Sequence, residues 1–228
     1  MPIWGIDLGG TKIEGVVLND DKLPKILVRK RIDTEAARGY QHIIRRIKLL
    51  IDTMAHELGY FPEKIGLGTP GAIDPISGLM KNANTTILNG RYFKEDVKKA
   101  LDIPLQIAND ANFFTLAEYK MGIVARESPQ ANVVFGEIMG TGVGGGIVVN
   151  GQLIHGRQGI GGEWGHNFLD ISGGPCYCGK TGCVETVISG KNLERYHHEK
   201  FHESKKLKDI YQGHLSGTSP NDSHTINR

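Results

Sequence analysis

The sequence predicts an α/β protein with mixed sheets, because strand-like segments alternate with amphipathic helices and the same order begins twice. Three strand-like segments near the N-terminus are followed by a helix, a strand and a helix, and a pair of strands restarts the pattern near residue 130. A chain of 228 residues is long enough for one or two domains with a hydrophobic core. We therefore expect two α/β units in tandem.

The first unit opens with a hairpin. Residues 3–8 and 13–18 are rich in strand-forming residues, and Gly9-Gly10-Thr11 provides a turn between them. The alternating segment 26–32 is a candidate third strand. Apolar residues recur at helical spacing from 39 to 58, and Gly59 is a stop signal.

A further strand and helix follow, and then another pair. Residues 65–67 form a short apolar segment that runs into a turn at 68–71, and apolar residues at 93, 97 and 101 share one face of a helix. Residues 103–107 predict the next strand, and Asn109-Asp110 are suited to begin the helix after it.

The second unit is predicted as a strand at 132–139, a glycine loop at 140–146 and a strand at 147–150, with a hairpin turn at Asn150-Gly151. A helix is plausible over 191–201. The chain is polar from residue 205, and its last twelve residues are rich in Ser, Thr, Asn, Asp, Gly and Pro, a composition typical of disorder.

Composition and charge exclude several function classes. The 27 Lys+Arg nearly balance the 25 Asp+Glu. The sequence has no stripe of basic residues that would indicate a nucleic-acid partner. No apolar run approaches the roughly 18 residues of a membrane helix, and the N-terminus lacks the pattern of a secretory signal. Three closely spaced cysteines do not suit a disulfide framework, so the expected location is the cytoplasm.

Glycine is the composition's main deviation: the chain has 31 glycines, and 16 of them lie between Gly136 and Gly182. The loop 140–146 formally matches G-x-G-x-x-G, but a strand follows it, whereas a dinucleotide fingerprint requires a helix. The loops at 9–11 and 140–146 are instead strand–glycine–strand turns, which could hold a polyphosphate from opposite sides. Thr11 and Lys12 could add donors, and Asp7 could hold Mg²⁺ through water. The alternative for the first loop is an ordinary hairpin turn.

Asn109 and Asp110 lie between a predicted strand and a predicted helix. Both residue types favour the helix N-cap. A carboxylate facing a polyphosphate could also accept the proton of a hydroxyl, and Asn109 could then provide the cap.

The strongest local signal is His166 followed by Cys176, Cys178 and Cys183. Three thiols and an imidazole make a Cys₃His set of the kind that binds structural zinc. Glu163 and Glu185 flank these residues and could contact a polyhydroxy ligand. The cluster of His197, His198 and His202 is interpreted as an exposed helix face rather than a second metal site.

Taken together, these motifs resemble the ROK family of bacterial sugar kinases. The resemblance covers about residues 3–192 and rests on Asp7-Leu-Gly-Gly-Thr-Lys12, Gly68-Thr-Pro-Gly71, Asn109-Asp-Ala-Asn112, Gly140-Thr-Gly-Val-Gly-Gly-Gly146, Gly162-Glu-Trp-Gly-His166 and Cys176-Tyr-Cys-Gly-Lys-Thr-Gly-Cys-Val-Glu185. The stretch Lys81–Gly90, together with Cys176-Tyr-Cys178, looks most like the fructokinase/mannokinase branch.

The resemblance implies a two-lobed actin/hexokinase-type ATPase fold with ribonuclease H-like mixed sheets, of which the second lobe is incomplete. It divides the chain into an N-terminal lobe (1–115), a partial second lobe with the zinc loop (116–210) and a disordered tail (211–228). It also implies a homodimer and the ligands ATP, Mg²⁺, Zn²⁺ and a hexose.

Roles for individual residues follow from the same resemblance. Asp110 would be the general base on the sugar's primary hydroxyl. The phosphate-binding residues would be Asp7, Gly9, Gly10, Thr11, Lys12, Gly140, Thr141 and Gly142. The sugar-binding residues would be Asn84, Asn109, Asp110, Glu163, His166 and Glu185, and the zinc ligands would be His166, Cys176, Cys178 and Cys183.

The expected activity is ATP-dependent phosphorylation of a hexose, fructose or mannose first, to the 6-phosphate. Kinases of this family continue beyond the position of Arg228 with a glycine-rich adenosine motif and a C-terminal helix. The alternatives are therefore a non-catalytic, zinc-stiffened sugar-binding remnant, or a kinase with glucokinase or N-acetylglucosamine kinase specificity.

Overall fold

A five-stranded mixed sheet forms the centre of the N-terminal lobe in the computed structural model, which describes residues 1–21 and 24–228. The strands are β1 (Ile3–Leu8), β2 (Lys12–Leu18), β3 (Ile26–Asp33), β4 (Ile65–Thr69) and β7 (Leu105–Asn109), in the order β3-β2-β1-β4-β7. The first three are antiparallel, and β4 and β7 run parallel to β1. The register places Asp7 beside Gly68 and Thr69 beside Asn109, so the ends of β1, β4 and β7 meet at one edge of the sheet.

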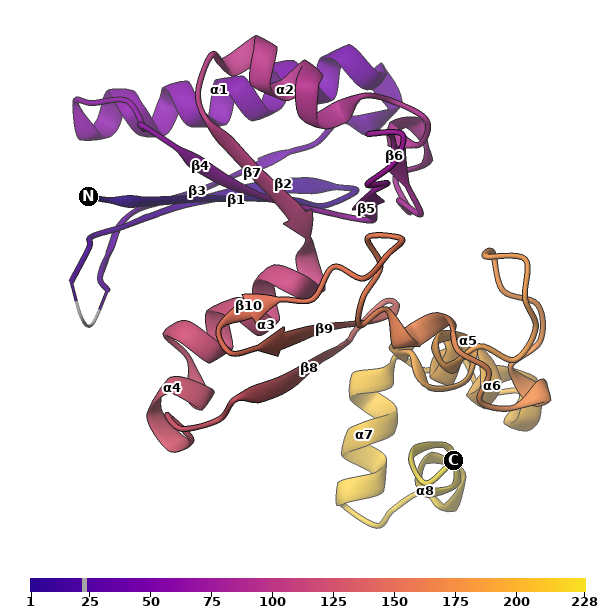
Figure 1. Cartoon of the computed structure of the whole chain (residues 1–228). Helices are drawn as coiled ribbons and strands as arrows, with labels where there is room; N and C mark the ends of the chain where they lie inside the picture. The colour runs from indigo at the N-terminus through magenta and orange to yellow at the C-terminus, as the bar shows by residue number, and fades with distance from the viewer. Residues whose placement is uncertain (22–23) are drawn as a thin grey trace.

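Two helices, α1 (Tyr40–Leu58) and α2 (Phe93–Leu101), lie together over one face of this sheet (Figure 1). The apolar stripe of α1 is buried in the core, as its periodicity predicts, and Gly59 ends the helix with a φ of 77°. Met54 of α1 packs so closely that a Cβ on Gly15 would lie 2.7 Å from its sulfur. The glycine in β2 therefore allows the helix to approach the sheet.

Short elements lie between the long strands and helices of this lobe. They are η1 (Ala36–Arg38), η2 (Thr86–Leu88) and a small antiparallel pair, β5 (Ala72–Ile73) with β6 (Met80–Lys81). The pair was not predicted, because strands of two residues carry no periodic signal. It follows the predicted turn at 68–71 and lies next to the cleft described below.

The second lobe begins with α3 (Asp110–Lys120), which follows β7 directly and packs against a three-stranded sheet. This sheet consists of β8 (Val133–Met139), β9 (Val143–Val149) and β10 (Gln152–Leu153), and α4 (Ile123–Glu127) lies between α3 and β8 in the chain. Strand β9 includes half of the predicted glycine loop, so the turn itself is short. The predicted boundary between the two lobes, at residues 115 and 116, falls within α3. This boundary stays a prediction.

The remaining elements are η3 (Trp164–His166), η4 (Ile171–Gly173), α5 (Val184–Ile188), α6 (Gly190–Phe201), α7 (Leu207–Leu215) and α8 (Pro220–Ile226). Helices α7 and α8 occupy much of the segment 211–228, where disorder was predicted, and that prediction is wrong. Ile210 is fully buried, and Ser219 caps α8 with Pro220 in its first turn. The composition suggested disorder here because the contacts that hold these helices in place are made largely by polar side chains.

None of the helices in the described part of the chain is both long and apolar enough to span a membrane.

Candidate functional site

A cleft of about 510 Å³ lies between the two lobes. The N-terminal lobe contributes the loop after β4 and Asn84, and Asn109-Asp110 lie at the junction. The second lobe contributes the turn before β9 and the side chains of Glu163, His166 and Glu185. The cleft therefore brings all six predicted sugar-binding residues into one cavity, although they come from separate parts of the chain.

The sequence left two roles open at Asn109 and Asp110, that of the helix N-cap and that of a carboxylate that faces the ligand. In the structure each residue suits one of them. Asn109 Oδ1 accepts hydrogen bonds from the backbone N–H groups of Ala111 (2.8 Å) and Asn112 (3.3 Å), so Asn109 is the N-cap of α3. Asp110 lines the cleft and is accessible from it, and its Oδ1 also accepts from Ala111 N at 2.8 Å. Because Asn109 caps the helix, Asp110 is available to a ligand in the cleft.

Four carboxylates share this neighbourhood. Partial burial, followed by the charges of Asp110 and Glu185, raises the pKa of Glu163 to about 7. Burial and the nearby charge of Asp110 also raise the pKa of Asp7, and burial raises that of Asp110. Such carboxylates accept hydrogen bonds from hydroxyl groups and attract divalent cations. The cleft is therefore suited to a polyhydroxy ligand and to a cation.

Glu185 connects the cleft to the second glycine turn. Its Oε2 accepts a hydrogen bond from Val143 N at 2.9 Å, and a Cβ on Gly142 would lie 2.4 Å from the same oxygen. Gly142 thus leaves room for a carboxylate that comes from more than forty positions further along the chain. Glu185, which is predicted to contact the sugar, therefore also supports the start of β9.

The two glycine turns face a second cavity of about 590 Å³. The first turn is closed by Gly9 N, which donates to Lys12 O at 2.9 Å. Gly10 and Thr11 from this turn and Thr141 from the other line the cavity. Asn84 and Thr141 line both cavities, so a ligand could extend from one into the other. Three of the predicted phosphate-binding residues line neither cavity: Asp7, Gly9 and Lys12.

The predicted metal ligands are brought together. One donor atom from each of His166, Cys176, Cys178 and Cys183 lies within 4.8 Å of the others. Cys176 Sγ is 3.5 Å from His166 Nδ1, and Cys178 Sγ is 3.6 Å from Cys183 Sγ. A cation among the sulfur atoms would thus meet His166 through Nδ1, while the ring itself also lines the cleft.

Tyr177 and Lys180 also line the cleft, although sequence reasoning did not select them. The hydroxyl of Tyr177 lies 3.0 Å from His166 Nε2, and Lys180 Nζ donates to His166 O at 3.2 Å. Both residues lie between cysteines of the segment 176–183, so their position among the predicted metal ligands was an available signal. Thr85 and Thr86 line the second cavity and were likewise not selected.

The second histidine cluster matches its prediction only in part. His198 and His202 are exposed, whereas His197 is fully buried and not on an exposed helix face. It lies on the inner side of α6 and contacts α8, so its environment depends on the segment that was expected to be disordered.

The sequence model of the ROK family matches residues 3–222. The N-acetyl-D-glucosamine kinase of Aliivibrio fischeri is 33% identical over 224 residues, which cover 94% of this chain and 71% of that protein. The corresponding enzyme of Aliivibrio salmonicida is 32% identical over 224 residues, with 94% and 72% covered.

Solved structures resemble the chain over almost its whole length. The ROK hexokinase of Thermus thermophilus superposes with a TM-score of 0.80 at 29% identity, covering 99% of this chain and 72% of that one. The ROK family glucokinase of Streptomyces griseus, solved with glucose and AMPPNP, gives a TM-score of 0.78 at 26% identity, covering 99% and 74%. The predicted hexokinase-type fold is thus confirmed.

Proposed function

The chain belongs to the ROK family, and we propose that it is an ATP-dependent hexose kinase that transfers the γ-phosphoryl group to the primary hydroxyl of a sugar. The observation that carries this proposal is the position of Asp110. Its carboxylate lies in a cleft lined by carboxylate, amide and imidazole side chains that suit sugar hydroxyls, and that cleft adjoins a cavity lined by two glycine turns. A base, a sugar site and a phosphate site in this order are what phosphoryl transfer to a hydroxyl requires.

In this mechanism Asp110 accepts the proton of the hydroxyl as its oxygen attacks the phosphorus. The cap provided by Asn109 keeps Asp110 at the start of α3, and a raised pKa makes its carboxylate a better base. Backbone N–H groups of the two glycine turns, other than those of Gly9 and Gly140 that close the turns, stabilise the charge on the transferred group. Bound Mg²⁺ would neutralise phosphate charge, and Asp7, whose pKa is raised beside Asp110, fits as a residue that holds it.

The Cys₃His cluster fits a structural zinc ion. The donor set has three sulfurs and one imidazole nitrogen, which is the chemistry that zinc prefers, and the donors already converge. His166, Cys176, Cys178 and Cys183 would hold the ion. It would cross-link the segment that presents Glu163, Tyr177 and Glu185 to the cleft, and so fix the sugar site.

The identity of the hexose is a separate proposal. The motif at 81–90 favoured fructose or mannose, but the curated relatives named above are N-acetyl-D-glucosamine kinases, and a similar solved structure is a glucokinase. We therefore place N-acetyl-D-glucosamine and glucose ahead of fructose and mannose.

The homodimer and the cytoplasmic location remain predictions, and light scattering of the purified chain tests the first of them.

The test of the proposal is an ATP-coupled assay of the purified chain with each of the four sugars, repeated with Asp110→Asn. This change keeps the shape of the side chain but removes the proton acceptor. We expect kcat to fall by about 10²–10⁴ with sugar affinity largely kept. Asp52→Asn on the exposed side of α1 is the matched control and should leave kcat unchanged.

Near-normal turnover of Asp110→Asn would exclude it as the base. Calorimetric sugar binding without turnover of any of the four sugars would favour the non-catalytic, sugar-binding alternative. The chain spans about seven tenths of the relatives' length.

A further inference from the structure

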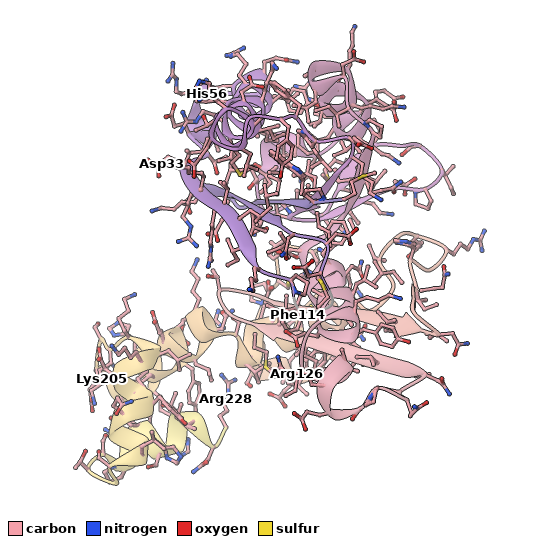
Figure 2. All side chains as sticks on the ribbon, turned by 90° about the vertical axis from the view of Figure 1, so that its left-hand side faces the viewer. Asp33, His56, Phe114, Arg126, Lys205 and Arg228 are labelled. Carbon is pink, nitrogen blue, oxygen red and sulfur yellow. The ribbon has the colours of Figure 1, made fainter. Side chains whose placement is uncertain are left out.

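A cluster of polar side chains joins three parts of the C-terminal helical region. His197 comes from α6, Glu203 and Lys205 from the loop that follows it, and Asp222 from α8. His197 is fully buried and Asp222 is 2% exposed. Figure 2 places Lys205 on this helical region, away from Asp33 and His56 of the N-terminal lobe. His197, Glu203, Lys205 and Asp222 are absent from the lining of the cleft and from the Cys₃His set, so the cluster is separate from both.

The hydrogen bonds around His197 determine which ring nitrogen carries the proton. The hydroxyl of Thr225 donates its one proton to Asn221 O at 3.0 Å. With that proton on Asn221 O, the same oxygen, which lies 2.8 Å from His197 Nδ1, accepts there, and this assignment places the ring hydrogen on Nδ1. In the neutral ring Nε2 then has a free lone pair.

That lone pair points at two carboxylate oxygens. Nε2 lies 3.4 Å from Asp222 Oδ1 and 3.5 Å from Glu203 Oε2, and it is buried without a hydrogen-bond partner among the described residues. Three electron-rich atoms from three segments thus face one another, all within 4.8 Å. Buried carboxylates beside an unpaired ring nitrogen require compensating positive charge.

Lys205 supplies part of that positive charge. Its Nζ lies 2.7 Å from Glu203 Oε2 and 3.0 Å from Asp222 Oδ1, while Asn221 Nδ2 donates to the other oxygen of Glu203 at 2.7 Å. Two carboxylates and one ammonium leave one uncompensated negative charge. Lys205 is 32% exposed on a flexible stem, so it can move into solvent when another cation arrives.

We propose that His197, Glu203 and Asp222 form a binding site for a divalent transition-metal ion such as Mn²⁺ or Zn²⁺. The ion is bound by His197 Nε2 and by one oxygen from each carboxylate, a nitrogen–oxygen set that suits these metals. Thr225 orients the ring as an outer hydrogen-bond partner. The ion replaces Lys205, makes the site electrically neutral, and ties α6, its following loop and α8 together.

The test is a Mn²⁺ titration of the whole chain, followed through the loss of the free Mn²⁺ signal in electron paramagnetic resonance. One equivalent of Zn²⁺ is added first to occupy the thiols, which are poor ligands for manganese. We expect the wild type to bind one more Mn²⁺ than His197→Gln. Glu203→Gln, whose side chain is partly exposed and keeps its shape, should bind that ion at least about tenfold more weakly.

Lys205→Met separates a metal site from an ion-pair network. Without a competing ammonium, the affinity for Mn²⁺ should rise by about tenfold. If Lys205 is instead the permanent partner of the carboxylates, this variant loses thermal stability and gains no affinity, and the proposal fails. Equal Mn²⁺ binding by the wild type, Glu203→Gln and Lys205→Met would also overturn it. Circular dichroism of each variant confirms that the chain remains folded.

Discussion

Glu163 illustrates how the cleft changes the chemistry of one residue. Burial and two neighbouring carboxylates raise its pKa from 4.5 to about 7, so the folded state holds this proton more tightly than the unfolded state does. Folding stability from this group is therefore present at low pH and is lost as the pH rises from about 4.5 to about 7. Near neutral pH the carboxyl group can serve as donor or acceptor to a sugar hydroxyl.

Glu163→Gln should remove that pH dependence, because the amide stays neutral. We expect the Tm of the variant relative to wild type to increase between pH 5 and pH 8, with the variant the more stable at pH 8. Thermal unfolding at the two pH values measures this. Glu137→Gln on the exposed side of β8 is the control and should show no such increase. A Tm difference for Glu163→Gln that is the same at both pH values would contradict the electrostatic explanation.

The glycines of β9 show that much of the glycine excess serves packing between elements. A Cβ on Gly165 of η3 would lie 1.9 Å from Val143 O, and one on Gly145 would lie 2.6 Å from Gly162 O. The segment 162–166 therefore rests directly on the backbone of β9. This contact positions Glu163 and His166, both of which line the cleft.

Gly165→Ala should displace η3 from β9. We expect a loss of about 1–3 kcal/mol in the free energy of unfolding, together with weaker sugar binding. Urea unfolding and calorimetry measure the two effects. Gly66→Ala is a matched control, because its Cβ would make only an ordinary contact, 3.8 Å from Trp4 O. If the two variants are equally stable, the close approach of η3 is not important for folding.

The Cys₃His segment has short bridges, such as Phe168 with Cys183, but few buried apolar residues. If it binds zinc, the ion can contribute on the order of 10 kcal/mol of apparent binding free energy to its folding. Cys178→Ser should then lose the metal, loosen residues 160–185, and reduce sugar affinity more than affinity for the ATP phosphates. Metal analysis and calorimetry check both outcomes, and wild-type protein without stoichiometric zinc would contradict them.

The apolar core is distributed unevenly over the whole molecule. Its main cluster contains residues from Trp4 to Leu105, all in the N-terminal lobe, and includes most of the buried face of α1. The second lobe and the C-terminal helices bury few large apolar side chains and rely more on glycine contacts and polar clusters. Figure 1 shows the corresponding separation of the C-terminal helices from the upper sheet.

Hydrogen exchange should therefore differ between the lobes. We expect the slowest amide exchange in α1, β1 and β4, and faster exchange in α7 and α8, because local opening costs least where few apolar contacts are broken. Mass spectrometry of peptides after exchange measures this order. Addition of Zn²⁺ should slow exchange in 160–185 most. Uniform protection along the chain would show that the two lobes unfold as one cooperative unit.

Local patterns were sufficient for the five-stranded sheet and the two α-helices of the N-terminal lobe and for the hairpin of the second lobe, but not for the short β5–β6 pair. Helical spacing over 40–58 and the glycine turn at 9–11 act within a few residues, so they can be read without knowledge of the rest of the chain. The motifs also identified several of the residues that line the cleft, since Asp110, Glu163 and Glu185 each stand in a characteristic local sequence.

The tertiary structure alone decided how those residues are used. The hydrogen bond from Val143 to Glu185, the packing of Gly165 on β9, and the burial of His197 against α8 all join residues that are far apart in the sequence. Composition predicted disorder after residue 211 because that segment is polar. Its helices form nevertheless, since their buried polar atoms find partners on α6, and such partners are determined only when the chain has folded.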